Sequence, residues 1–245
     1  MASAIYCLND LHDVEADRLH PKKRTRPIAS GEVSRRLAIT LMSVLILLSL
    51  GISFFTLSNE AKKVTLIITF YLLLNIAYCF RLKRYAIIDV FVISLGFVLR
   101  LAAGGVACDI WLSPWIVLMT FLLALFLAFA KRRDDVVIFE ANGIVTRKNV
   151  ERYNLPFMNQ VLGMIGTITI VCYIMYTLST DVELRFGNRY VYITSVFVIA
   201  AILHYLQVAI VDKNSGSPTK VFLHDRFIQG CLVLWIATFA VLLYL

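Results

Sequence analysis

The stretch RRLAITLMSVLILLSLGISFFTL, residues 35–57, is almost entirely apolar after its two arginines. A helix needs about 20 such residues to cross the hydrocarbon core of a bilayer. Because lipid offers no partners for backbone polar groups, such a run predicts a helix rather than an open sheet. Comparable runs follow at 64–80, 86–106, 112–130, 160–179, 190–211 and 227–245. The sequence therefore predicts an all-α membrane protein with seven full spans, in a single integral membrane domain over 1–245.

The overall composition agrees with membrane embedding and gives an orientation. Of the 245 residues, 60% are hydrophobic and only 16% are charged, which excludes an ordinary soluble domain. Most of the 24 lysine and arginine residues lie on the side of the spans that holds residues 9–31. The positive-inside rule places that side in the cytoplasm. We therefore expect a multi-pass protein of the cell (inner) membrane, and no nucleic-acid partner. The five cysteines are scattered without metal-binding spacing.

Charges of both signs are concentrated in NDLHDVEADRLHPKKRTRPIASG, residues 9–31. On a helix, Asp10, Asp13 and Asp17 fall within about 60° of one another, one above the next. Stacked carboxylates repel one another unless a cation lies between them. Hard oxygen ligands with few protein contacts suit Mg²⁺, which completes its shell with water and substrate phosphate. We predict a metal site at Asn9, Asp10, Asp13 and Asp17, with the three aspartates catalytic; the alternative is a solvated acidic helix end.

Cations follow these carboxylates directly and recur elsewhere on the same side. The two longest polar connections are 18–34 and 131–159, and the first carries a loop that is able to fold back over the acidic helix end. Because arginine matches phosphate with two parallel hydrogen bonds, clustered cations beside carboxylates indicate a site for anions and a metal. The residues expected to bind such an anion are Lys22, Lys23, Arg24 and Arg26.

The same residues resemble a known family. NDLHDVEADR fits the NDxxDxxxD motif of the UbiA superfamily of intramembrane prenyltransferases, and YCFRLKR, residues 78–84, resembles its tyrosine–lysine element at Tyr78 and Lys83. The resemblance implies a helical bundle of nine spans around a central cavity open to the cytoplasm. It also implies Mg²⁺-dependent transfer with a diphosphate leaving group.

Further elements are most similar to one branch of this superfamily, the decaprenyl-phosphate phosphoribosyltransferases, which implies a role in making cell-wall precursors. These elements are GFVLRLAAGG, LAFAKRRDD and SGSPTKVFLHDRF, at 96–105, 127–135 and 215–227. The expected reaction is transfer of 5-phosphoribosyl from phosphoribosyl diphosphate to a polyprenyl phosphate. One alternative is prenyl transfer from a polyprenyl diphosphate to an aromatic acceptor such as 4-hydroxybenzoate. A second alternative is a non-enzymatic transporter or lipid-binding scaffold.

The basic segment at 131–135 separates the two enzymatic alternatives. Members that prenylate aromatic rings carry further carboxylates there, whereas this chain has three cations before Asp134 and Asp135. A cationic site suits two phosphorylated substrates, a sugar donor and a lipid phosphate, better than an uncharged ring. The predicted substrate-binding set is completed by Tyr78, Lys83, Asp89, Arg100, Lys131, Arg132, Arg133, Asp134 and Asp135.

Arg100, a member of this set, has a structural role as an alternative to substrate binding. Arg100 is the one cation within a predicted span, where charge faces a cavity or a partner. It either binds substrate, with Asp89 as a metal or ribose contact, or pairs with carbonyls of a neighbouring helix.

Only about eight residues precede Asn9, a length of about 12 Å as a helix. Compared with the nine-span family, we expect the first helix and most of the second to be missing from this sequence.

Overall fold

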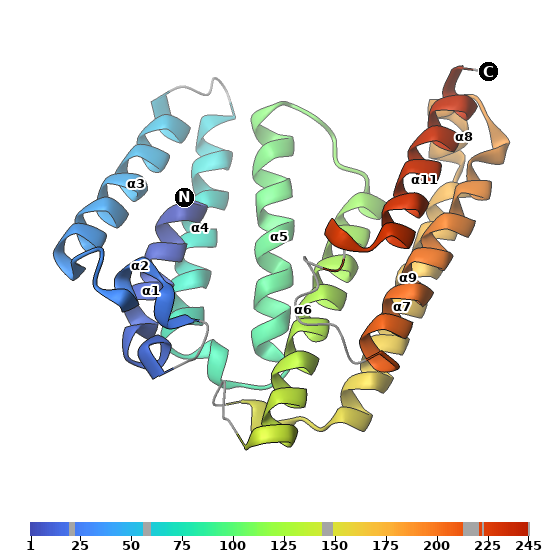
Figure 1. The fold of residues 1–245 in the computed structure, drawn as a ribbon. Helices are drawn as coiled ribbons and strands as arrows, with labels where there is room; N and C mark the ends of the chain where they lie inside the picture. Colours follow the sequence, from blue (N-terminus) through green and yellow to red (C-terminus); the bar gives the residue numbers. More distant parts are fainter. Residues whose placement is uncertain (20–22, 56–59, 144–148, 213–220, 222, 245) are drawn as a thin grey trace. The chain divides into compact units, whose positions relative to one another are not determined.

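The computed structural model describes residues 1–19, 23–55, 60–143, 149–212, 221 and 223–244, and its fold is shown in Figure 1. Within these ranges the regular structure is helical throughout, without a strand. Seven helices are long and apolar enough to cross a membrane: Arg35–Phe55, Ala61–Phe80, Ile88–Ala107, Pro114–Ala141, Leu155–Thr177, Arg189–Ile210 and Arg226–Leu243. The predicted all-α membrane protein with seven full spans is confirmed.

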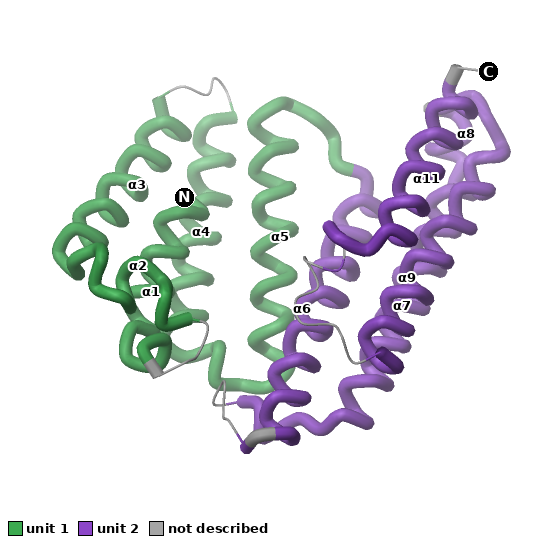
Figure 2. The backbone as a smooth tube through the Cα atoms, in the orientation of Figure 1, with its two compact units in different colours: residues 1–112 green, residues 113–245 purple. Residues whose placement is uncertain are grey.

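The chain divides into two compact units, 1–112 and 113–245, which Figure 2 shows in different colours. Each unit consists of helices that pack on one another, and each is described in turn. The expectations of one integral membrane domain and of a central cavity that opens to the cytoplasm stay predictions.

The first unit contains five α-helices and two short 3₁₀ turns. They are α1 (Ala2–Leu19), η1 (Lys23–Thr25), α2 (Pro27–Ser30), α3 (Arg35–Phe55), α4 (Ala61–Phe80), η2 (Leu82–Arg84) and α5 (Ile88–Ala107). Helix α1 packs against α2, α3 and α4, and α4 packs against α5. The acidic helix end expected at residues 1–18 is therefore a helix held by three others.

The segment after α1 folds back because its apolar residues pack against that helix. Ile28 of α2 and Ala38 of α3 form a small buried core with Val14 of α1. Arg18 Nε donates a hydrogen bond to the carbonyl of Ala29 at 3.1 Å, which fastens α2 to α1. This packing holds Arg26, the residue before α2, beside the acidic face of α1.

The connection from η2 to α5 contains a strained turn. Ile87 has φ 68° and ψ −50°, and the amide of Ile88 donates to the carbonyl of Ala86 at 2.8 Å. These are the features of a γ-turn of the rare form, which is unfavourable for a β-branched residue. The turn starts α5 so that Asp89, in its first turn, is fully buried.

The second unit consists of α6 (Pro114–Asn142), η3 (Val150–Arg152), α7 (Leu155–Thr177), α8 (Thr180–Phe186), η4 (Arg189–Thr194), α9 (Ser195–Ile210) and α11 (Arg226–Tyr244). Helix α7 packs against α6 and α9, and α9 packs against α11. At Gly166 of α7 a Cβ would lie 3.2 Å from Ile202 Cγ2 of α9. The absence of a side chain there lets the two helices approach closely.

Helix α6 is longer than the apolar run that predicted it. Ser113 Oγ accepts a hydrogen bond from the amide of Ile116, Pro114 opens the first turn, and the helix ends at Gly143, which has φ 66°. We expected a polar connection over 131–159, but the helix continues to Asn142 because no glycine or proline interrupts it after Pro114. Residues 131–135 therefore lie on a helix rather than on a loop.

Candidate active site

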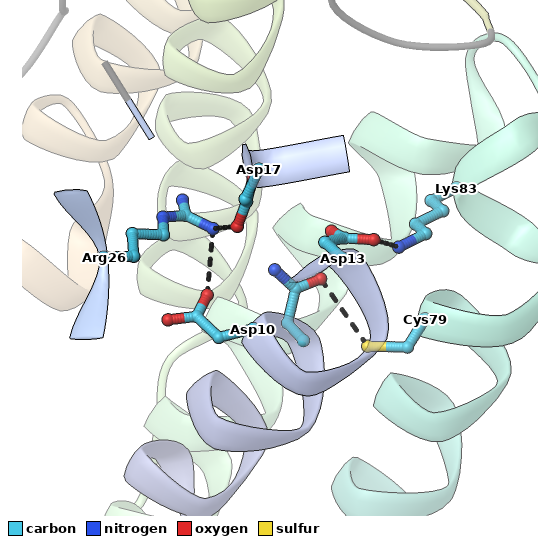
Figure 3. Close-up of polar contacts among 7 residues, drawn as sticks. Asp10, Asp13, Asp17, Arg26, Cys79 and Lys83 are labelled. Carbon is cyan, nitrogen blue, oxygen red and sulfur yellow. Dashed lines mark hydrogen bonds and ion pairs between the residues drawn. The ribbon is translucent and has the colours of Figure 1, made fainter. Parts of the chain in front are cut away.

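The carboxylates of Asp10 and Asp17, two turns apart on α1, meet at one nitrogen atom (Figure 3). Arg26 Nη1 donates to Asp10 Oδ1 at 2.9 Å and to Asp17 Oδ2 at 2.7 Å. The Asp17 side chain is only 5% exposed, so its charge depends on this partner. The folded-back loop thus places a cation where two stacked carboxylates need one.

Asp13 and Asn9 face a different part of the unit, the end of α4 and the η2 turn. Asp13 Oδ1 accepts a hydrogen bond from Lys83 Nζ, and Asn9 Oδ1 accepts a weak one from Cys79 Sγ at 3.8 Å (Figure 3). The structure therefore brings Lys83 to the motif helix, although 70 residues separate it from Asp13. The α1 motif contacts basic side chains from two segments.

The charge on Asp10 is only partly compensated. Burial raises the pKa of Asp10, Arg26 lowers it, and the neighbouring carboxylates of Asp17 and Asp13 raise it further, so that the pKa lies above its ordinary value. A raised pKa means that the ionised form is disfavoured in the fold. An additional cation beside Asp10 would reverse this effect.

The donor set of α1 fits a hard divalent cation. Two carboxylate oxygens already converge on one cationic atom, and Mg²⁺ needs only one or two carboxylates when water and phosphate complete its octahedron. Among the described residues, no three histidine, cysteine or acidic side chains are grouped closely enough to hold a metal by themselves. A metal bound here would therefore rely on ligands from water and substrate, after Arg26 has moved aside.

The other predicted residues of this unit lie at several depths. Tyr78 on α4 and Lys23 in η1 are half-buried, whereas Arg24 is exposed. Asp89 is fully buried at the start of α5. Lys22 lies outside the described residues, so its role in anion binding stays a prediction.

Arg100, on the third turn of α5 beyond Asp89, is held by aromatic side chains. Its guanidinium lies 4.2 Å from the ring centre of Phe97 and 5.7 Å from that of Tyr71. Arg100 Nη1 also donates to the Tyr71 hydroxyl on α4 at 3.1 Å. These contacts agree with the structural alternative, in which Arg100 pairs with a neighbouring helix, although the acceptor is a phenol and not a carbonyl. A substrate role for Arg100 stays a prediction.

The basic segment of α6 in the second unit is deeply buried. Arg132 and Arg133 are each 2% exposed, whereas Lys131 is exposed. Arg132 Nη1 lies 3.4 Å from Asp135 Oδ2, one turn away on the same helix. Arg133 Nε donates to Asn159 Oδ1 of α7 at 2.7 Å, and its Nη1 is buried without a hydrogen-bond partner in the described ranges. Asp134 and Asp135, on the next turn, are half-buried.

Two polar features of the second unit were not among the predicted site residues. Asn149, just before η3, is fully buried, and neither of its amide side-chain atoms has a hydrogen-bond partner among the described residues. His204 Nε2 of α9 lies 3.0 Å from Asp225 Oδ2, and Asp225 Oδ1 accepts hydrogen bonds from the amides of Phe227 and Ile228. Nothing in the sequence around Asn149 sets it apart from an ordinary loop residue, so only its burial reveals it.

Comparison with known proteins identifies the family of this chain. Residues 1–229 match the UbiA prenyltransferase family. The chain belongs to the UbiA prenyltransferase family. Among its relatives is the decaprenyl-phosphate phosphoribosyltransferase of Mycolicibacterium smegmatis, 37% identical over 99% of this chain and 77% of the relative. The enzyme of the same name from Corynebacterium glutamicum is 36% identical over 100% of this chain and 73% of the relative. The predicted resemblance to this UbiA branch is confirmed, and the protein is a transferase.

Solved UbiA structures confirm the fold. A UbiA homologue from Archaeoglobus fulgidus bound to DMAPP and Mg²⁺ superposes with a TM-score of 0.68 at 19% identity, covering 98% of this chain and 82% of the homologue. The same homologue bound to GPP and Mg²⁺ gives the same score. At this identity the likeness concerns the fold alone. The scaffold or transporter alternative is excluded by the family, whereas the individual site residues stay predictions.

Proposed function

We propose that this UbiA protein transfers 5-phosphoribosyl from phosphoribosyl diphosphate to a polyprenyl phosphate of the decaprenyl type and releases diphosphate. The observation that carries the proposal is the buried arginine pair of α6, Arg132 and Arg133. The names of the Mycolicibacterium and Corynebacterium relatives, which match nearly the whole chain, support the same reaction.

The arginine pair favours phosphorylated substrates for an energetic reason. A buried guanidinium is costly unless charge and hydrogen bonds compensate it, and Arg133 keeps one nitrogen atom without a partner. The neighbouring Asp134 carboxylate already supplies part of the charge, and a phosphate oxygen would supply an acceptor together with further charge. An uncharged aromatic acceptor would supply no compensating charge, so prenyl transfer to a ring suits this segment less well.

The reaction needs little acid–base chemistry from the protein. The bond between the anomeric carbon and the diphosphate oxygen breaks, the diphosphate leaves with the electron pair, and an oxygen of the lipid phosphate forms the new bond to that carbon. Because the lipid phosphate is already ionised at neutral pH, no general base is required. Mg²⁺, when bound by Asp10 and Asp17, supplies charge neutralisation for the departing diphosphate.

Arg26 has two roles in this scheme, one toward the carboxylates of α1 and one toward the diphosphate. In the structure it neutralises Asp10 and Asp17. In the reaction its guanidinium would donate to the diphosphate, together with Lys22, Lys23 and Arg24, and Asp10 and Asp17 would then be the residues that hold Mg²⁺. Lys83 keeps Asp13 in place, and Arg132 and Arg133 bind a phosphate of the donor or of the lipid.

The proposed setting is the cytoplasmic face of the cell membrane. The water-soluble donor reaches the charged loops from the cytoplasm, and the polyprenyl phosphate arrives within the bilayer. This arrangement agrees with seven membrane-spanning helices and with cations gathered on one side of them.

A direct assay separates the two transferase reactions. The protein, in detergent or lipid nanodiscs with Mg²⁺, is given radiolabelled phosphoribosyl diphosphate and a short polyprenyl phosphate; in parallel it is given a prenyl diphosphate and 4-hydroxybenzoate. We expect labelled lipid in the first assay and no product in the second. Product only in the second assay would replace the proposal with aromatic prenylation.

A further inference from the structure

The Asn149 side chain has the environment of a ligand-binding group rather than of a structural one. It is fully buried, and within the part of the chain that the structure describes neither Oδ1 nor Nδ2 has a hydrogen-bond partner. Although it stands directly before η3, its side chain does not cap that turn; only its backbone carbonyl is used, by the amide of Arg152. An unpaired buried amide destabilises the fold, so an apolar residue of the same size would serve the fold better.

A second unpaired polar atom lies on the helix against which η3 packs. Helix α6 contacts η3, and Arg133 of α6 has its Nη1 buried without a partner. Its Nε is fixed by Asn159 Oδ1 of α7 at 2.7 Å, so the orientation of the guanidinium is set before any ligand binds. The amide of Leu155 donates to Glu140 Oε1 at 3.2 Å, which ties the end of α6 to the start of α7. The neighbouring elements α6, η3 and α7 of the second unit thus carry one cationic donor and one complete amide.

The two groups together define the chemistry of the ligand. The amide offers a donor and an acceptor side by side, whereas Arg133 Nη1 offers a charged donor. A phosphate accepts but does not donate at neutral pH, so it satisfies Arg133 and leaves Asn149 Oδ1 unpaired. A prenyl chain satisfies neither. A sugar with two adjacent hydroxyls next to a phosphate satisfies both groups, because a hydroxyl donates as well as accepts.

We infer that Asn149 recognises the 2- and 3-hydroxyls of the ribose in the donor, and that Arg133 Nη1 binds its 5-phosphate. This inference takes its ligand class from the proposed function. It adds a specificity-determining residue: the amide selects ribose over a sugar that lacks one of the two hydroxyls.

The test compares two sugar phosphates on the purified full chain. We measure the dissociation constants of ribose 5-phosphate and 2-deoxyribose 5-phosphate, together with the thermal unfolding midpoint, for the wild type and for Asn149→Leu. The wild type should bind ribose 5-phosphate about tenfold more tightly than the deoxy sugar. In Asn149→Leu this ratio should fall to about one, while the unfolding midpoint stays unchanged or rises.

Asn188→Leu is the matched control, because the Asn188 amide has protein partners on both sides. Its Oδ1 accepts from the amide of Tyr190 at 2.9 Å, and its Nδ2 donates to the carbonyl of Leu242 at 3.0 Å. This variant should lower the unfolding midpoint and leave the ribose-to-deoxyribose ratio intact. The opposite pattern in Asn149→Leu, lost selectivity without lost stability, is not expected from a structural asparagine.

Three results would overturn the inference. They are no binding of ribose 5-phosphate by the wild type, an unchanged ratio in Asn149→Leu, or a lower midpoint with unchanged affinity, which would assign the amide to a buried water molecule. The proposed function fails separately, when labelled phosphoribosyl is not transferred to lipid. Selective ribose 5-phosphate binding that depends on Asn149 would then still support the inference.

Discussion

The aspartate cluster of α1 (Asp10, Asp13 and Asp17) and the arginine pair of α6 (Arg132 and Arg133) handle buried charge in opposite ways. The aspartates are paired with cations that come from other segments, Arg26 before α2 and Lys83 in η2. The arginines are more deeply buried, are fixed by neighbours on α6 and α7, and keep one unpaired nitrogen.

This difference indicates that the two clusters would rearrange to different extents when a ligand binds. The aspartate cluster is neutralised by side chains that would have to move before the proposed metal could bind. In the arginine pair, the Arg133 guanidinium is already held by Asn159, so the proposed phosphate would not have to orient it. Variants that remove one partner at a time should therefore affect the two clusters differently.

The largest effect is expected for Asp17→Asn. It removes the more deeply buried of the two carboxylates that converge on Arg26. Because an amide oxygen carries no charge to hold a divalent cation, turnover should fall about a hundredfold or more. The measurement is kcat for phosphoribosyl transfer over a range of Mg²⁺ concentrations.

Glu15→Gln is the control for this change. Glu15 is on the same helix, but it is exposed and pairs with Arg35, so its neutralisation should leave kcat within about twofold, as surface ion pairs contribute little. Near-normal, Mg²⁺-dependent turnover of Asp17→Asn would mean that α1 does not hold the metal.

A smaller effect is expected when Arg132 and Arg133 are both replaced by glutamine. Loss of a charge-assisted hydrogen bond is worth about 1.5–3 kcal/mol, which corresponds to a Michaelis constant raised about tenfold or more for one phosphorylated substrate. Lys62→Gln, at an exposed position near the start of α4, should leave both Michaelis constants within about twofold. Unchanged constants for donor and acceptor in the double variant would leave the pair with a role in membrane topology alone.

The smallest effect on stability is expected for Asp225, whose carboxylate is hydrogen-bonded by groups of the protein itself. Burial raises its pKa, but the amide of Ile228, the His204 ring and the amide of Phe227 lower it more, so the pKa lies below its ordinary value. Asp225 therefore stabilises the fold above its unfolded pKa of about 3.9, and this stabilisation is lost as the pH falls through the lowered value. Asp225→Asn should cost about 1 kcal/mol at pH 7.

The pH dependence distinguishes this charge from a simple loss of packing. The difference in unfolding midpoint between the wild type and Asp225→Asn should be present at pH 7 and should be smaller at pH 3, where the carboxylate begins to be protonated. Asp212→Asn, at an exposed position, should show no difference at either pH. An equal difference at both pH values would show that the charge of Asp225 contributes nothing.

The fold could be predicted from the sequence because apolar runs of sufficient length have one solution in lipid, the helix. The end of α6 could not, because charged residues after 130 stop the apolar pattern without stopping the helix. The resemblance placed Lys83 in the candidate site as a substrate-binding residue, but its pairing with Asp13 could not be predicted from spacing, since 70 residues separate them. The γ-turn at Ile87 and the unpaired amide of Asn149 depend on tertiary packing, which leaves no local pattern.

The length of α6 has a consequence for the lipid that surrounds the protein. Its apolar part, 114–130, is about 25 Å long at 1.5 Å per residue, slightly less than a typical hydrocarbon core of about 30 Å. When this part spans the core, Arg132 and Arg133 follow it at the membrane interface, where the proposed polyprenyl phosphate would present its head group. In a bilayer of longer acyl chains, the membrane must thin or the helix must sink. Acyl-chain length should therefore tune the turnover of this transferase.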